Sequence, residues 1–341
     1  MVVSETLKNN TNKPAANSTK IIDVDRDYQG DLEQAIAAAK DGDTIQLGAN
    51  TYYTDGLVIN HDITIRGRQG SIVNGQATSK SIFHLTLEAT GTTIQNLEIT
   101  NGNNGILVEG TTDVLLNNLD INNIGIEETI RDGSNNTGII LDHADGFQLL
   151  NSTIHNIGRK AVGISNTDSG LVSNLAVHDV NLAAEHAQSH DAAGVKLFNT
   201  NEITIQDSYF TDINAISIWN DITNLTTIEN NQIINAGEDF LAPAFNTSVE
   251  IIGIYNEKSS NSTVRENQVN AVGEFTAFRA TEFSTETMTI EDNDFSNYQL
   301  GTTDYWVNES AEKLVATTSN PDEADFSLFA DDYLTQANIG E

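Results

Sequence analysis

The sequence contains no cysteine, and only 16 of its 341 residues are lysine or arginine. Without cysteine the chain can form neither a disulfide bond nor a thiolate metal site, so zinc fingers and thiol enzymes are excluded. The 49 acidic residues give a formal net charge of -33, which repels nucleic acid and anionic membranes at long range. We therefore expect no nucleic-acid partner.

Long apolar runs are also missing. No stretch approaches the roughly 18 to 20 consecutive apolar residues of a membrane span, so we expect no membrane insertion. The opening residues Met1 to Ser4 do not begin a signal peptide with a basic start and an apolar centre. An exported chain would therefore have lost its signal or would use another route. The acidic surface is explained either by solubility alone or by bound Ca²⁺, which prefers acidic oxygen ligands.

A repeat runs through the middle of the chain, in which an apolar triplet and a turn precede an Asn-containing strand. Aligned with one another, the repeats give three columns without a polar member. The first column is Ile106, Ile139, Val162, Val195, Ile218, Ile254 and Phe278. The second is Ile94, Leu116, Leu149, Val172, Ile205, Ile228, Val264 and Ile290. The third is Ile99, Ile121, Ile154, Val177, Phe210, Ile233, Val269 and Phe295.

The spacing of the first column supports the repeat. Its steps are 33, 23, 33, 23, 36 and 24 residues, so a rung of about 23 residues is lengthened at every second turn. The insertions are expected as loops around 126–136, 183–193 and 239–248. β-Branched residues fill the columns and Gly, Asn and Asp fill the corners, which predicts three short parallel strands per rung rather than helices. A further column of side chains that can bond one another at a turn is interpreted as structural: Asn118, Asn151, Asn174, Asp207 and Asn230.

These features predict an all-β chain that forms a single right-handed parallel β-helix over residues 21–300. Both ends of such a solenoid expose strand edges that need covering. At the N-terminal end, Asp31 can cap a helix from Leu32 to Lys40, with Gly42 just beyond it. Residues 1–20 are expected as a disordered leader, and residues 301–341, where the repeat is lost, as an irregular C-terminal cap or tail.

The segment from Leu32 to Leu47 (LEQAIAAAKDGDTIQL), followed by GANTY at 48–52 and ITIRG at 63–67, resembles the entry segment of pectin-lyase-like β-helix proteins. With the repeat, the resemblance covers roughly residues 21–298. This superfamily includes polysaccharide lyases, uronan epimerases, glycoside hydrolases, phage tailspikes and noncatalytic surface proteins. The resemblance therefore implies a carbohydrate partner and an extracellular or cell-surface location, and does not fix a reaction.

Two catalytic signatures of the superfamily are absent. The Asp-Pro-His-Glu motif of alginate epimerases has only a distant counterpart in the run from Asp142 to Asp145 (DHAD), and the polygalacturonase pattern is missing. In lyases similar to chondroitinase B and alginate lyase, a Lys is followed one rung later by an Arg. Here Lys196 is followed by Trp219, and Arg279 comes two rungs further on.

One outward-facing strip carries the chemistry. Because side chains alternate along a strand, the residue after each member of the first column should face solvent. That position is held by Lys196, Trp219, Tyr255 and Arg279 on consecutive rungs, a ladder about 14 Å long at the ordinary strand spacing. The position two residues further along each strand faces the same way, and on five rungs it is held by Asp142, Ser165, Phe198, Asp221 and Glu257. Cations and aromatic faces flanked by acids and long loops are typical of an oligosaccharide groove, although exposed aromatics can also simply pack beneath a loop.

Roles are assigned on that basis for a uronic-acid polymer such as alginate or pectate. β-Elimination needs a base at C5 and a positive charge beside the carboxylate, so Lys196 or Tyr255 is the candidate base and Arg279 the candidate neutraliser. The candidate Ca²⁺ ligands are Asp221, Glu257 and Asp142. Candidate substrate contacts are Trp219, Phe198, His190 and Asn220.

Three functions remain open. The first is a lyase or C5-epimerase, with Ca²⁺ assistance. The second is a retaining glycoside hydrolase that uses Asp221 and Glu257, whose adjacent rungs approach the roughly 5 to 5.5 Å separation of a retaining pair. The third is a noncatalytic glycan-binding adhesin. A loop cluster of Glu185, His186, His190 and Asp191, and the aligned pair His155 and His178, are weaker candidates for a transition-metal site. We expect a monomer.

Overall fold

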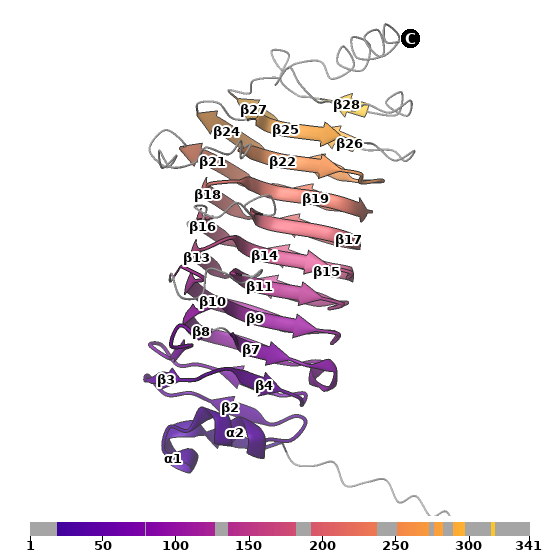
Figure 1. Cartoon of the computed structure of the whole chain (residues 1–341). Helices are drawn as coiled ribbons and strands as arrows, with labels where there is room; N and C mark the ends of the chain where they lie inside the picture. The colour runs from indigo at the N-terminus through magenta and orange to yellow at the C-terminus, as the bar shows by residue number, and fades with distance from the viewer. Residues whose placement is uncertain are drawn as a thin grey trace, which may run out of the picture.

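The computed structural model describes residues 19–78, 80–126, 136–181, 192–236, 251–272, 276–281, 289–296 and 315–317. Every strand in these ranges pairs in parallel with strands one rung away, so the chain winds into a stack of rungs (Figure 1). The predicted all-β fold, a single parallel β-helix, is confirmed. From β2 to β25 each rung contributes strands to three faces, and β8, β10 and β17 turn a corner and take part in two of them.

The first face carries the candidate site. Its strands, in order of pairing, are β4 (Leu57–Ile59), β7 (Ser81–Leu85), β9 (Asn104–Glu109), β11 (Thr137–Asp142), β14 (Lys160–Ser165), β17 (Ala193–Gln206), β19 (Ile216–Asn224), β22 (Ile252–Glu257) and β25 (Thr276–Thr281).

The second face begins nearest the N-terminus. It consists of β1 (Ile21–Asp23), β2 (Thr44–Gln46), β5 (Thr64–Arg66), β8 (Thr93–Gly102), β10 (Leu115–Ile124), β12 (Phe147–Leu150), β15 (Asp168–Ser173), the second half of β17, β20 (Thr227–Glu229), β23 (Thr263–Arg265), β26 (Thr289–Glu291) and β28 (Val315–Thr317). The third face consists of β3 (Thr51–Tyr53), β6 (Ile72–Asn74), the second halves of β8 and β10, β13 (Thr153–Ile157), β16 (Ala176–Val180), β18 (Tyr209–Ile213), β21 (Gln232–Ala236), β24 (Gln268–Val272) and β27 (Asp294–Ser296).

The three apolar columns predicted from the sequence form the core in the predicted register. In the first column, for example, Ile139 pairs with both Ile106 and Val162, and Ile218 pairs with Ile254. The other two columns pair in the same way from rung to rung. Column members whose side chains the structure describes are buried, because stacked aliphatic side chains of the same shape exclude water along the whole axis.

The corner column of Asn and Asp residues is structural, as predicted. All its members have positive φ, a conformation that Asn and Asp tolerate better than other non-glycine residues. Their side chains link rungs: Asn174 donates to Asn151 over 2.8 Å, and Asn230 donates to Asp207 over 2.6 Å.

A second amide ladder was not predicted, although it directly follows the corner column. The buried side chain of Asn231 donates to Asn267, and that of Asn267 donates to Asn293. The same Asn267 oxygen accepts the backbone N–H of Asn231. These amides satisfy backbone groups at the point where the chain turns inward.

The N-terminal end of the stack holds α1 (Val24–Tyr28) and α2 (Leu32–Ala38), seen below β2 in Figure 1. Asp31 accepts the backbone N–H of Gln34 as the predicted N-cap, and the helix ends two residues earlier than expected. The apolar side of α2 belongs to the core of the β-helix. A 3-10 turn covers Leu87–Ala89, and no helix in the described ranges is long and apolar enough to span a membrane.

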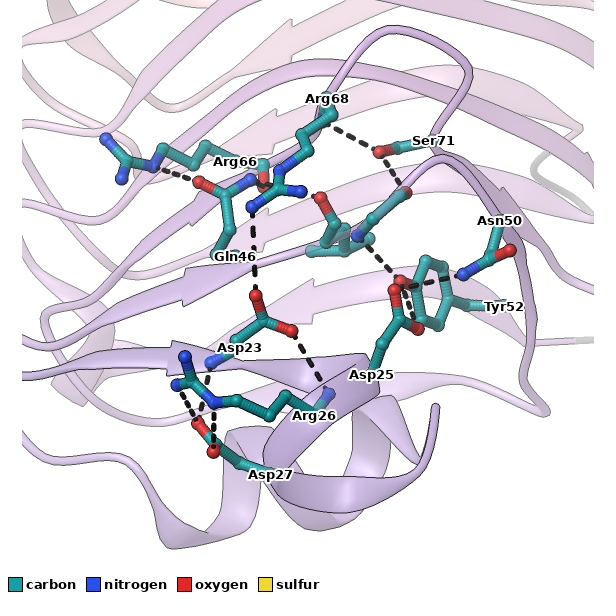
Figure 2. A network of polar contacts seen from close by, with 12 residues as sticks. Asp23, Asp25, Arg26, Asp27, Gln46, Asn50, Tyr52, Arg66, Arg68 and Ser71 are labelled. Carbon is teal, nitrogen blue, oxygen red and sulfur yellow. Dashed lines mark hydrogen bonds and ion pairs between the residues drawn. The ribbon is translucent and has the colours of Figure 1, made fainter.

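A polar network joins α1 to the first rungs (Figure 2). The hydroxyl of Tyr52 donates to Asp25 over 2.9 Å and accepts the backbone N–H of Gly48 over 2.8 Å, while Asn50 donates to the other oxygen of Asp25. A Cβ at position 48 would lie 2.0 Å from the Asp25 carboxylate. The close approach therefore requires glycine at position 48.

Several predictions lie outside the described residues. These are the leader up to residue 18, most of the three insertions, and the loop cluster of Glu185, His186, His190 and Asp191. Within 301–341 the structure describes β28 alone, which pairs with β26 and places Ala316 beside Ile290 of the second column.

Candidate functional site

The predicted strip is present in register on the first face. Lys196, Trp219, Tyr255 and Arg279 come from β17, β19, β22 and β25, and each pairs with the next as a direct Cα partner. Two residues further along, Asp221 pairs with Phe198 on one side and Glu257 on the other. For Arg279 the structure describes the backbone position and not the side chain.

Lys196 makes two close contacts on the next rung. Its Nζ lies 3.5 Å from the centre of the Trp219 ring and 3.4 Å from Oδ2 of Asp221. An ammonium ion above an aromatic face and beside a carboxylate is attracted to both. These two contacts fix the ammonium group over β19.

The strip is more buried than the sequence predicts. Lys196 and Trp219 are each only 9% exposed, and Trp219 packs in a small apolar cluster with Ala193, Ile216 and Ile252, separate from the main core. Alternation along the strand correctly gives the direction of these side chains, but long side chains only one strand spacing apart cover each other. The solvent-facing ladder expected from the sequence is therefore a packed row.

Tyr255 and Glu257 extend the cluster to the following rung. The rings of Trp219 and Tyr255 lie 5.7 Å apart at an interplanar angle of 32°, and the indole N–H of Trp219 donates to Oε2 of Glu257 over 3.1 Å. Burial raises the pKa of Glu257 above its ordinary value, and the neighbouring Asp221 carboxylate raises it further. The two carboxylates therefore have different environments, since Asp221 pairs with the Lys196 ammonium and Glu257 accepts a hydrogen bond from the Trp219 indole.

A hollow of about 390 Å³ adjoins Lys196 on the side of the earlier rungs. It lies over β11, β14 and β17 and is lined by Ile140, Gly163 and Phe198 as well as by Lys160 and Lys196. Gly163 occupies the strip position between Ile140 and Lys196, and the nearest side-chain atom to a Cβ placed there would be 3.8 Å away. The hollow therefore exists because Gly163 has no side chain, and Lys160 and Lys196 both line it.

The structure does not place all the predicted residues on this strip. Asn220 is fully buried, because it faces the interior between the outward residues 219 and 221, and it donates to Asn256 over 2.6 Å. It cannot contact substrate from that position, so this assignment is wrong. His190 lies outside the described residues. Phe198 is exposed at the edge of the hollow, where a substrate can reach it.

Of the three candidate calcium ligands, Asp221 and Glu257 lie on adjacent rungs and Asp142 lies apart from them. Asp142 lies three rungs from Asp221 and accepts hydrogen bonds from Ser165 and Asn166, each over 2.9 Å. Asp221 already pairs with the Lys196 ammonium over 3.4 Å. Ca²⁺ takes six to eight oxygen ligands, and within the described ranges no group of three or more His or carboxylate side chains can hold a metal. The residues present therefore fit Ca²⁺ poorly.

His155 and His178 do meet on the third face. Their rings stack with centres 4.7 Å apart, His155 contacts Asp120 over 3.1 Å, and His178 contacts Asp179 over 2.7 Å. Parallel stacking places the two rings face to face, whereas ligation of one ion needs ring nitrogens that converge. This pair is a rung-to-rung contact.

The fold resembles known proteins at the level of family and of solved structures. A family model for the right-handed beta helix region matches residues 137–311, just over half of the chain. The chain belongs to this family. No curated protein is significantly similar to this β-helix protein in sequence.

Among solved structures, the β-helix is similar to the alginate lyase from Paenibacillus sp. str. FPU-7, with a TM-score of 0.60 and 14% identity over 88% of this chain and 98% of that one. A Dettilon tailspike protein gives a TM-score of 0.55 and 14% identity over 87% of this chain and 68% of that one. The catalytic domain of a GH87 alpha-1,3-glucanase, in complex with tetrasaccharides, gives 0.53 and 13% identity over 83% and 60%. At such identities these likenesses show the shared fold.

Proposed function

We propose that this protein is a polysaccharide lyase that cleaves a uronic-acid-containing polymer, such as alginate or pectate, by β-elimination, and that it meets this polymer outside the cell. The observation that carries the proposal is the hollow bordered by Lys160 and Lys196 next to the packed row of Lys196, Trp219 and Tyr255. The chain has only 16 basic residues and a net charge of -33. Two of these basic residues line one hollow, so positive charge is concentrated there although Lys196 also pairs with Asp221.

The geometry fits a sugar that carries a carboxylate. A hollow of about 390 Å³ is in the range of small-ligand sites, and its apolar lining from Ile140 and Phe198 suits the C–H faces of a pyranose ring. The lysines at its borders can pair with the carboxylate. The alginate lyase that shares this fold over most of its length supports the same substrate class.

β-Elimination requires a base and a cation, and residues of the packed row can supply both. A base removes the proton at C5, the C4–O bond breaks, the electrons of the C–H bond become the C4=C5 double bond, and the departing oxygen takes up a proton. Lys196 neutralises the carboxylate, because its ammonium lies over Trp219 at the edge of the hollow, and it shares its charge between Asp221 and the sugar. Tyr255 is the base, and Arg279, one rung beyond, is a second cation. An epimerase would share the first step and return the proton to the opposite face of the sugar.

The test is cleavage of alginate, polygalacturonate and a glycosaminoglycan, followed by the ultraviolet absorbance of the unsaturated product. Tyr255→Phe and Lys196→Met should each lower kcat by about 100-fold or more, because each removes one group that acts on the transition state. Lys40→Met, which removes an exposed lysine just beyond α2, serves as the charge-matched control and should retain full activity. Unchanged activity in both site variants, or no cleavage of any of these polymers, contradicts the proposal.

Hydrolysis is the second candidate, and the contrast between Asp221 and Glu257 favours it. Glu257, with its raised pKa, has the property of a general acid, and Asp221 on the adjacent rung has that of a nucleophile. Both carboxylates already have partners in Lys196 and Trp219, so a sugar would have to displace them. New reducing ends without the unsaturated product, lost in Glu257→Gln, would establish hydrolysis. Retention of intact polymer without cleavage would instead indicate a noncatalytic glycan-binding protein.

A further inference from the structure

A second hollow lies beside the strip, where the strands of the first face end. It has a volume of about 540 Å³ and is lined mainly by amide and hydroxyl side chains, including Asn199, Asn201 and Asn224, together with Ile222 and Lys258. Ile222 and Lys258 directly follow the site carboxylates Asp221 and Glu257 in sequence. The lining of this hollow therefore begins one residue beyond the site carboxylates.

The residues at this edge form a column of left-handed backbone positions. His143, Asn166, Asn199, Ile222 and Lys258 each follow a paired residue of the strip, and all have φ between 49° and 56°. Among the described residues with positive φ, Ile222 is the single β-branched one. A β-branched side chain in this conformation is a genuine outlier that costs conformational energy. Most described positions of this kind hold Asn, Asp or glycine.

Ile222 also interrupts a ladder of amides. Asn166 donates to Asp142 and Asn199 donates to Asn166, each over 2.9 Å. The next residue in the column is Ile222, whose side chain has no donor to offer to the amide oxygen of Asn199. It is 44% exposed, so burial in the core does not account for the isoleucine either.

A scattered exposed apolar residue needs no explanation, but a strained one at a break in a ladder, within a hollow, does. We infer that this hollow is a second saccharide-binding subsite, in which Ile222 supports the apolar face of a sugar ring and the amide of Asn199 accepts a sugar hydroxyl. The ligand class is a hydroxyl-rich pyranose, recognised through its ring face and hydroxyls. The lining carries one lysine, Lys258, and one aspartate, Asp168, so it offers no strong preference for charge.

The chain supplies a matched control three residues away. Leu225 has φ 54° and is 46% exposed, closely similar to the 56° and 44% of Ile222, but it does not line the hollow. Ile222→Asn and Leu225→Asn both replace an exposed apolar residue in the left-handed region with the residue that tolerates this conformation best. Both should therefore raise the melting temperature by about 1 to 3 °C.

Binding separates the two variants. Affinity gel electrophoresis with alginate, polygalacturonate and laminarin should show that Ile222→Asn weakens retention by the bound polymer about three- to ten-fold, the loss expected for one apolar contact area of a sugar ring. Leu225→Asn should leave retention unchanged. Unchanged retention of Ile222→Asn, equal losses in both variants, or no retention of the unaltered protein by any of these polymers overturns the inference.

The inference rests on the proposed function only in that the ligand is a saccharide. If retention depends on Ile222 but no polymer is cleaved, the lyase proposal is refuted and the subsite is supported. If cleavage depends on Tyr255 but retention does not change in Ile222→Asn, the subsite is refuted and the lyase proposal is supported.

Discussion

The ion pair between Lys196 and Asp221 is expected to stabilise the fold measurably, and it allows the arrangement of the site to be tested without a substrate. The side chains of the pair are 11% and 14% exposed, and the charged atoms are 3.4 Å apart. At an effective dielectric constant of about 20, two unit charges at that distance attract by about 5 kcal/mol. Part of this attraction offsets the loss of hydration of both groups.

Lys196→Met removes the charge and keeps an unbranched apolar side chain over the Trp219 ring. Asp221 then remains buried beside Glu257 without its cation, and we expect the free energy of unfolding to fall by about 3 kcal/mol. Asp221→Asn in the same chain removes the stranded charge and should restore most of that loss. A double-mutant cycle measured by urea unfolding should therefore give a coupling energy of about 2 kcal/mol.

An exposed pair provides the control for this cycle. Arg265 on β23 donates to Glu229 on β20, and the two side chains are more open to solvent than those of Lys196 and Asp221. Arg265→Met with Glu229→Gln should give a coupling energy below about 1 kcal/mol, as is usual for surface pairs. If the Lys196 and Asp221 cycle gives less than about 0.5 kcal/mol, the ammonium is not fixed between Asp221 and Trp219, and the arrangement of the site described above is refuted.

Three further predictions concern the hollow, the site carboxylate and the interior ladder. Gly163→Leu should fill the hollow beside Lys196 and lower affinity for uronate oligosaccharides at least ten-fold. The melting temperature should change little, because the hollow has room for the side chain and its Cβ meets nothing closer than Lys160 at 3.8 Å. Calorimetric titration checks the affinity, and unchanged affinity would exclude the hollow as a binding site. The raised pKa of Glu257 means that the folded protein binds more protons than the unfolded chain between the ordinary value of 4.5 and the raised value, so stability is lost as pH rises through that window. Glu257→Gln should remove this loss in melting curves recorded across pH, and an unaltered pH profile would contradict the assignment. Asn267→Ala should lower the free energy of unfolding by about 2 to 4 kcal/mol, because it leaves the buried backbone N–H of Asn231 without its acceptor and removes one of the hydrogen bonds of the Asn231 side chain. A loss under about 1 kcal/mol in urea unfolding would contradict the role of the ladder.

The register of the fold could be predicted from sequence because it depends on residue type at a fixed repeat. Ile139, Val162 and Val195 share a requirement for an aliphatic side chain in a narrow core, and a shift by one residue would turn every one of them outward. The outward neighbours Lys196 and Trp219 were therefore placed correctly as well. The corner Asn residues were interpretable for a similar reason, since few other side chains accept a positive φ.

Contacts between outward side chains could not be predicted in the same way. Whether Lys196 points to solvent or lies over Trp219 depends on side-chain rotamers and on which partner is within reach, and alternation along a strand does not determine either. Asn220 was misplaced although the alternation that gave Lys196 and Trp219 also assigns position 220 to the interior. The ladder of Asn231, Asn267 and Asn293 was missed, because buried amides were not expected directly after a corner.

In this fold, different positions of each strand contribute to stability and to function. Along the first face, the buried column stays aliphatic from Ile106 to Ile254, while the outward column one residue later changes from Leu107 and Ile140 to Gly163, Lys196 and Trp219. Since adjacent positions face opposite sides, the outward column can change its chemistry at each rung without altering the core that holds the register. The corner column behaves differently, because its side chains must also tolerate a left-handed backbone. An exposed isoleucine at position 222 therefore has a conformational cost that residues of the outward column do not have. Ile222→Asn should increase the stability of the fold and at the same time decrease saccharide binding.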